Sequence, residues 1–308
     1  MSAGGGTRAV VAALLANLGI AALKLIAFAI TRSSSMLAEG VHSLADSTNQ
    51  ALLLLGGKRA RRDATPTHPF GYGRERYFWS FVVALLLFSV GSLFALYEGF
   101  HKLHEHKPLD RPAVALGVLV GAIVLETLSF RTAIRESNAI RRGTWVQFVR
   151  HAKVPELPVV LLEDLAALIG LVLALGGVGL AAATGDPVWD AYGTLAIGVL
   201  LGVVAVILAV EMKSLLIGES AGELIDARIE AALVHGAEVE RVIHLRTLHL
   251  GPEELLVGAK IAVSGAVTAD DLARGIDAAE ARVRAAVPEA RVIYLEPDLD
   301  RAPGGAGT

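Results

Sequence analysis

Long apolar segments are the feature of this sequence that most restricts the folds it can adopt. Six of them, each of about 20 residues or more, lie at residues 9–31, 36–57, 77–100, 113–133, 157–183 and 190–216. A helix of roughly 20 apolar residues is long enough to cross the hydrocarbon core of a membrane. We therefore expect a polytopic α-helical membrane protein with six transmembrane helices.

The composition of the 308-residue chain supports this class, because 54% of its residues are hydrophobic and only 19% are charged. Cys is absent, which excludes a disulfide framework and a thiolate metal site. A bound metal would therefore be held by imidazole, carboxylate or water. We expect no prosthetic group and no nucleic-acid partner.

Two of the connections between the spans are rich in basic residues. Six Lys or Arg residues lie at residues 58–76 and six more at residues 131–153, whereas each of the other connections holds at most three. Loops rich in Lys and Arg stay on the cytoplasmic side of a membrane. With an even number of spans, both termini are then cytoplasmic, and we expect the protein in the cytoplasmic membrane of a bacterium.

The sequence changes character after residue 216, where charged and apolar residues alternate as in a soluble domain. Helical and strand patterns follow one another at residues 221–235, 239–249, 254–264, 268–287 and 290–296. This αββαβ order predicts a small α+β domain with an antiparallel sheet covered on one side by helices. The predicted domains are a six-helix transmembrane domain at 9–216, a cytoplasmic domain at 217–298 and a disordered tail at 299–308.

Polar residues interrupt the second span in a regular pattern. Glu39, His42, Asp46 and Asn49 are spaced by three, four and three residues, so one face of a helix carries all four. A charged residue costs roughly 2.5–3.5 kcal/mol at the centre of a membrane helix, so it needs a partner or a function. His42 and Asp46 could bind one cation from a single helical turn. The alternative is a buried His–Asp hydrogen bond that joins two helices.

The fifth span contains two adjacent carboxyl groups, those of Glu163 and Asp164. Adjacent positions of a helix point about 100° apart, so at most one of the two faces His42 directly. Nitrogen and oxygen ligands suit Zn²⁺, Mn²⁺, Co²⁺ or Fe²⁺. Imidazole titrates near neutral pH, so protonation would compete with the metal and release it.

Three further polar residues are candidates for supporting roles. We expect Asn49 to orient Asp46 or to bond across helices, and Glu39 to be either an entrance charge or a solvated helix end. Glu126, in the fourth span, could support the metal site or a proton path, or form an isolated hydrogen bond between helices.

Two sequence motifs stand out. They are residues 36–46, Met-Leu-Ala-Glu-Gly-Val-His-Ser-Leu-Ala-Asp, and residues 68–74, His-Pro-Phe-Gly-Tyr-Gly-Arg. Together they resemble the cation diffusion facilitator family of divalent-cation/proton antiporters. The resemblance extends from about residue 9 to 298. It implies a six-helix bundle with a ferredoxin-like cytoplasmic domain, assembled as a homodimer, with a transport site shared by the second and fifth spans.

The resemblance also implies roles for individual residues. His42 and Asp46 match the two ligand positions of the second span, and Asp164 matches the downstream acidic position of the fifth. The family usually has His or Asp where this chain has Val160, and Glu163 is the nearest substitute. Residues 161–167, Leu-Leu-Glu-Asp-Leu-Ala-Ala, are similar to a branch that includes mitochondrial zinc transporters of animals.

These expectations combine into one functional hypothesis. The protein would export a divalent transition cation, Zn²⁺ before Mn²⁺, Co²⁺ or Fe²⁺, from the cytoplasm in exchange for protons by alternating access. We expect no enzymatic activity, since a His–Asp pair without a nucleophile or substrate cleft offers no reaction. The alternative is a non-transporting membrane scaffold whose polar stripe is a structural hydrogen-bond network.

Overall fold

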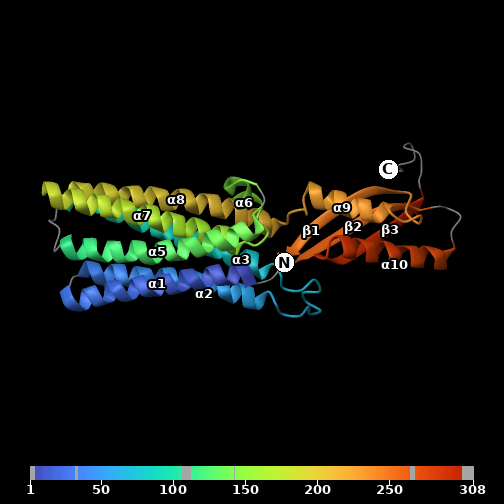
Figure 1. The fold of residues 1–308 in the computed structure, drawn as a ribbon, viewed down its shortest axis with the longest axis horizontal. Helices are drawn as coiled ribbons and strands as arrows, with labels where there is room; N and C mark the ends of the chain where they lie inside the picture. Colours follow the sequence, from blue (N-terminus) through green and yellow to red (C-terminus); the bar gives the residue numbers. More distant parts are fainter. Residues whose placement is uncertain (1–3, 32–33, 106–111, 142, 264–267, 300–308) are drawn as a thin grey trace. The chain divides into compact units, whose positions relative to one another are not determined.

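The computed structural model describes residues 4–31, 34–105, 112–141, 143–263 and 268–299 (Figure 1). Within these ranges, the side chains of residues 4–5, 27–28, 30–31, 34–42, 45–46, 86–88 and 105 are outside the description. The chain forms two compact units. One comprises residues 1–62 and 75–213, and the other comprises residues 63–74 and 214–308.

The first unit is a helical bundle whose long helices run side by side (Figure 1). Its elements are α1 (Gly4–Thr31), α2 (Ser34–Arg59), α3 (Glu75–Val82), the π-helical segment η1 (Val83–Leu87), α4 (Phe88–Glu105), α5 (Pro112–Ile140), α6 (Trp145–His151), α7 (Glu156–Thr184) and α8 (Val188–Ile217). Helix α1 packs against α2, α5 and α7, and α5 packs against α7. This arrangement brings together the helices that carry the candidate site residues.

Among the described residues, five helical segments are long and apolar enough to cross a membrane: Gly6–Ile26, Glu75–His104, Pro112–Ile140, Glu156–Thr184 and Val188–Ile217. They correspond to five of the six predicted spans, with α3, η1 and α4 together forming the third. Helix α2 has 26 residues and is long enough, but the polar residues of its first half lower its hydropathy. Its role as a span stays a prediction.

Two ion pairs join helices near the ends of the segment that α3, η1 and α4 form. Arg76, at the start of α3, donates from Nη2 to Oε2 of Glu156 on α7 at 2.7 Å, and its Nε binds the other carboxylate oxygen. Lys102, near the end of α4, donates to Oδ2 of Asp190 on α8 at 2.9 Å. The two ends of this segment are therefore held by different helices.

Close helix packing between α4 and α8 depends on small residues. A Cβ added at Gly99 would lie 2.8 Å from Cγ of Leu195, and one added at Gly198 would lie 2.8 Å from Cγ of Leu96. The Ser92 hydroxyl donates to the Gly198 carbonyl at 2.7 Å. Small residues let membrane helices approach closely, so this contact needs glycine at both positions.

The second unit contains the predicted αββαβ order, with α9 (Glu223–Val234), β1 (Arg241–Gly251), β2 (Glu254–Val263), α10 (Ala269–Ala286) and β3 (Ala290–Leu299). In the described part, the sheet order is β1-β2-β3. Strands β1 and β2 pair antiparallel, but β2 and β3 pair parallel. The expectation of an antiparallel sheet is therefore wrong for β3, because α10 returns the chain to the end of the sheet at which β2 begins.

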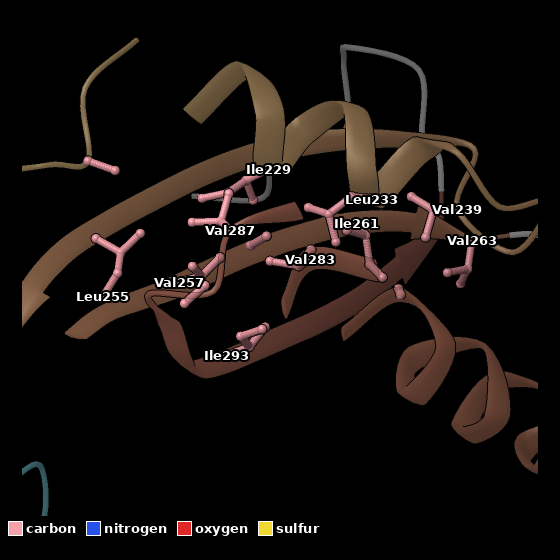
Figure 2. Packing of buried hydrophobic residues seen from close by; sticks show 14 residues of the cluster. Ile229, Leu233, Val239, Leu255, Val257, Ile261, Val263, Val283, Val287 and Ile293 are labelled. Atoms are coloured by element: carbon pink, nitrogen blue, oxygen red, sulfur yellow. The ribbon is translucent and has the colours of Figure 1, made fainter. Parts of the chain in front are cut away.

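The core of this unit lies between the sheet and its helices (Figure 2). Ile229 and Leu233 come from α9, Val283 comes from α10, and Leu255 and Ile261 come from β2. Each is at most 1% exposed. Thr268 caps α10 by accepting a hydrogen bond from the Asp271 amide at 3.2 Å.

The loop at residues 63–74 belongs to the second unit, although it connects α2 to α3 in the first. A Cβ added at Gly73 would lie 2.7 Å from the Leu250 carbonyl oxygen and 3.1 Å from Cα of Gly251. Within the loop, the Thr65 and Tyr72 hydroxyls are 3.2 Å apart. The loop therefore packs its backbone directly against the end of β1.

Candidate functional site

Helix α2 carries the predicted ligands His42 and Asp46, together with Glu39. Their side chains lie outside the described residues, so their predicted roles stay predictions. Among the described side chains, no group of three or more His, Asp or Glu residues is close enough to hold a metal ion. The candidate site is therefore built from the described polar residues of α1, α2, α5 and α7 that contact one another.

Glu163, on α7, is bound by two amides from α2. Its Oε1 accepts a hydrogen bond from Nε2 of Gln50 at 2.7 Å and another from Nδ2 of Asn49 at 3.3 Å. All three residues are buried. Asn49 and Gln50 follow Asp46 by three and four residues, which places them one helical turn beyond that ligand candidate. Glu163 thus contacts the same helix that carries His42 and Asp46.

A third helix extends this contact. Nδ2 of Asn17, on α1, donates to Oε1 of Gln50 at 3.3 Å. A chain of hydrogen bonds therefore runs from α1 through α2 to the carboxylate on α7. The sequence prediction missed Asn17 and Gln50. Gln50 could have been found from its spacing of four residues after Asp46, but Asn17 has no comparable signal.

Asp164, the neighbour of Glu163, is bound by a different helix. Its Oδ2 accepts a hydrogen bond from the Ser129 hydroxyl on α5 at 2.7 Å. The carboxyl group of Glu126, one turn earlier on α5, also interacts with that of Asp164. Glu126, Ser129 and Asp164 are at most 3% exposed. Two carboxyl groups and a hydroxyl are therefore gathered at one buried position between α5 and α7.

The two adjacent carboxyl groups therefore point to different neighbours, as the angle between successive helical positions requires. Glu163 faces α2 and Asp164 faces α5. Val160, where the resemblance places His or Asp, is fully buried. Glu163 lies three residues further along α7, on the same side of the helix as Val160. The substitute role that the sequence suggests for Glu163 stays a prediction.

Comparison with known proteins identifies the family. Residues 10–217 match the model of the cation efflux transmembrane domain. This chain belongs to the cation efflux, or cation diffusion facilitator, family. The match covers more than half of the chain and includes every residue of the candidate site. It confirms the resemblance carried by the two motifs, and together with the apolar helices it makes this family member an integral membrane protein.

The chain is also similar in sequence to several named proteins of animals and plants. The chain is 33% identical over 247 residues to the mitochondrial proton-coupled zinc antiporter SLC30A9 of Xenopus laevis, covering 79% of this chain and 44% of that protein. The chain is 31% identical to the human protein of the same name, and the alignment again covers 79% of this chain and 44% of that protein. Metal tolerance protein C4 of Arabidopsis thaliana is 30% identical over 261 residues, covering 84% of this chain and 57% of that protein. The chain thus spans about half the length of these relatives.

Proposed function

We propose that this family member is a proton-coupled transporter of divalent transition cations, with Zn²⁺ as its main substrate. The observation that carries the proposal is the pair of buried carboxyl groups on α7, one bound to α2 and the other to α5. Ionisable groups are costly inside a membrane, so they are rare there and usually mark the path of a substrate or ion. The names of the similar antiporters support zinc and proton coupling.

The proposed ligands are His42 and Asp46 from α2 and Asp164 from α7, with Glu163 assisting. One imidazole and several carboxylates form a donor set that suits Zn²⁺, and Mn²⁺, Co²⁺ or Fe²⁺ to a lesser degree. The absence of Cys removes the ligand that would favour Cu⁺. The cation and protons are the substrates of this transporter, and neither is a resident cofactor.

Proton coupling would use the carboxyl cluster on α5 and α7. A metal ligand must be deprotonated, so a cation and a proton would compete for the Asp164 carboxyl group, and a returning proton would weaken the bond to the metal. Alternating access would then export the cation from the cytoplasm, with both termini of a homodimer on the cytoplasmic side. The basic connections at residues 58–76 and 131–153 support this orientation.

A reconstituted transport assay tests the proposal. The purified protein is placed in lipid vesicles that contain a zinc-sensitive dye, and Zn²⁺ uptake is measured with and without an imposed pH gradient. We expect uptake that depends on the gradient and is abolished by Asp46→Ala and by Asp164→Ala. Thr132→Ala is the control, since this hydroxyl on α5 donates to the Leu128 carbonyl of its own helix.

Two results would overturn parts of this proposal. Uptake no faster than in empty vesicles would reject transport and favour the scaffold, in which the same polar groups only join helices. Normal uptake by the Asp46→Ala and Asp164→Ala variants would reject the site. Calorimetric titration with Zn²⁺ and Mn²⁺ gives a second readout, because a purely structural network should bind neither ion at micromolar concentration.

A further inference from the structure

We propose that Gln50 is a positioning residue that fixes the Glu163 carboxylate for metal binding and is itself fixed by Asn17. This inference rests on the proposed function, since it concerns a ligand of the same site. Neither Gln50 nor Asn17 belongs to the ligand set that the family resemblance implies. Their role follows from the hydrogen bonds between α1, α2 and α7.

The two hydrogen bonds of the Gln50 side chain determine the orientation of its amide group. Its side chain is completely buried, and both ends of its amide are used, with Nε2 on Glu163 at 2.7 Å and Oε1 on Asn17 at 3.3 Å. A carboxylate offers only acceptors, so the NH₂ group of Gln50 must face α7 and its carbonyl must face α1. Asn17 supplies the donor that this carbonyl needs.

The hydrogen bonds also determine how Glu163 is held. Asn49 and Gln50 both donate to Oε1, from consecutive positions of α2. A carboxylate that binds a metal is usually hydrogen-bonded by residues that do not touch the metal, and these bonds set its orientation. Asn49 and Gln50 have this relation to Glu163, and of the two bonds the one from Gln50 is shorter.

The arrangement explains how the chain can lack a ligand at Val160. A Glu side chain is longer and has more torsional freedom than the His or Asp expected there, so it needs external constraints to present a defined ligand. Gln50 supplies a constraint from the helix that carries His42 and Asp46. Its loss should therefore weaken metal binding without removing any ligand.

The test compares Gln50→Met with the wild type in the vesicle assay. Met has a similar volume but no amide, so packing is retained while the hydrogen bonds are lost. We expect the KM for Zn²⁺ to rise by about 10–100-fold, with the maximum rate much less affected. A merely structural role would instead lower the amount of folded protein or the maximum rate. An unchanged KM would overturn the inference.

Two further variants keep the inference testable if Gln50→Met folds poorly. Asn17→Ala removes only the hydrogen bond from Asn17 to Gln50. The KM of this variant for Zn²⁺ should rise by about 5-fold, the factor that corresponds to the loss of one ordinary hydrogen bond. Thr48→Ala is the control on α2, because this exposed hydroxyl bonds to Leu44 of its own helix. Equal KM values for wild type, Thr48→Ala and Asn17→Ala would count against the proposed positioning.

A double-mutant cycle separates the inference from the proposed function. If Gln50 acts through Glu163, adding Gln50→Met to Glu163→Gln should raise the KM no further, so the two effects are not additive. Additive effects would show that Gln50 acts elsewhere. If the wild type transports no Zn²⁺, the proposed function fails. If the wild type transports and Gln50→Met keeps its KM, only the role of Gln50 fails.

Discussion

The interior of the helical bundle and the interior of the C-terminal unit differ in what they bury. The described core of the C-terminal unit is a cluster of aliphatic side chains from α9, α10 and the sheet. The bundle buries apolar side chains as well, but it also buries Gln50, Glu163 and Asp164, each hydrogen-bonded to another helix. Apolar packing stabilises a fold directly, whereas a buried polar group must first recover its desolvation cost. We therefore expect the aliphatic cluster of the C-terminal unit to contribute mainly stability, and the buried polar groups of the bundle to contribute to the proposed cation site.

One buried polar contact of the bundle has a different character. Arg76 and Glu156 form a largely buried ion pair whose side chains are 14% and 6% exposed. Glu156 lies seven residues before Glu163 on the same helix, about 10 Å away along its axis. Its partner is a permanent charge, whereas Glu163 is held by neutral amides. We therefore expect the Arg76–Glu156 pair to stabilise the bundle and to play no part in binding the cation.

The largest expected effect is a loss of stability when the Arg76–Glu156 ion pair is broken. Arg76→Gln should destabilise the protein by about 3–5 kcal/mol, because it leaves the buried Glu156 carboxylate without its ionic partner. Thermal unfolding of the detergent-solubilised protein measures the change. Lys102→Gln is the matched control, since its pair with Asp190 is 36% exposed on the Lys102 side and should contribute only about 0–1 kcal/mol. Equal losses for the two variants would remove the distinction between them.

The next effect concerns the apolar interior. Leu233→Ala should destabilise the C-terminal unit by about 2–5 kcal/mol, because this fully buried side chain would leave a cavity. Hydrogen exchange of the amides in residues 223–299 measures the loss. Leu224→Ala on the same helix is the control, since Leu224 is 79% exposed and should change stability by less than about 0.5 kcal/mol. Loss of Zn²⁺ binding at the bundle in Leu233→Ala would contradict the division between the two interiors.

A variant among the buried polar residues of the bundle should change the free energy of unfolding only slightly but reduce Zn²⁺ uptake strongly. Ser129→Ala removes the hydroxyl that donates to Asp164, and Zn²⁺ uptake should fall by about 10–100-fold. Stability should change by only about 1 kcal/mol, the usual contribution of one hydrogen bond. The vesicle assay and thermal unfolding measure the two quantities on the same preparation. A large loss of stability with normal uptake would make this cluster structural.

The smallest effect is a pH dependence in the C-terminal unit. Burial alone raises the pKa of Glu238, but a hydrogen bond from its own backbone amide and the Arg282 guanidinium outweigh burial and lower the pKa. A lowered pKa stabilises the folded state fully above the unfolded value of about 4.3, and this contribution is lost as the pH falls through the folded pKa. Because the pair is partly exposed, the loss should stay below about 1 kcal/mol. Denaturant unfolding at pH 7 and pH 3 measures this loss of stability. Glu238→Gln should abolish the part of the pH dependence that comes from Glu238.

Much of the architecture can be predicted from the sequence because it depends on local patterns. Apolar runs of sufficient length mark the spans, and the alternation of helical and strand periods predicts the αββαβ order. The motifs at residues 36–46 and 68–74 point to the family. The adjacent positions of Glu163 and Asp164 already require that the two carboxyl groups diverge.

Tertiary structure decides the features that depend on how elements are placed against one another. The rotation of α7 between α2 and α5 determines that Glu163 meets Gln50 while Asp164 meets Ser129. The crossover through α10 makes β3 parallel to β2. Asn17 joins the site only because α1 packs against α2. Sequence periodicity specifies which face of an element is polar, but only packing between distant segments selects the neighbour that this face meets.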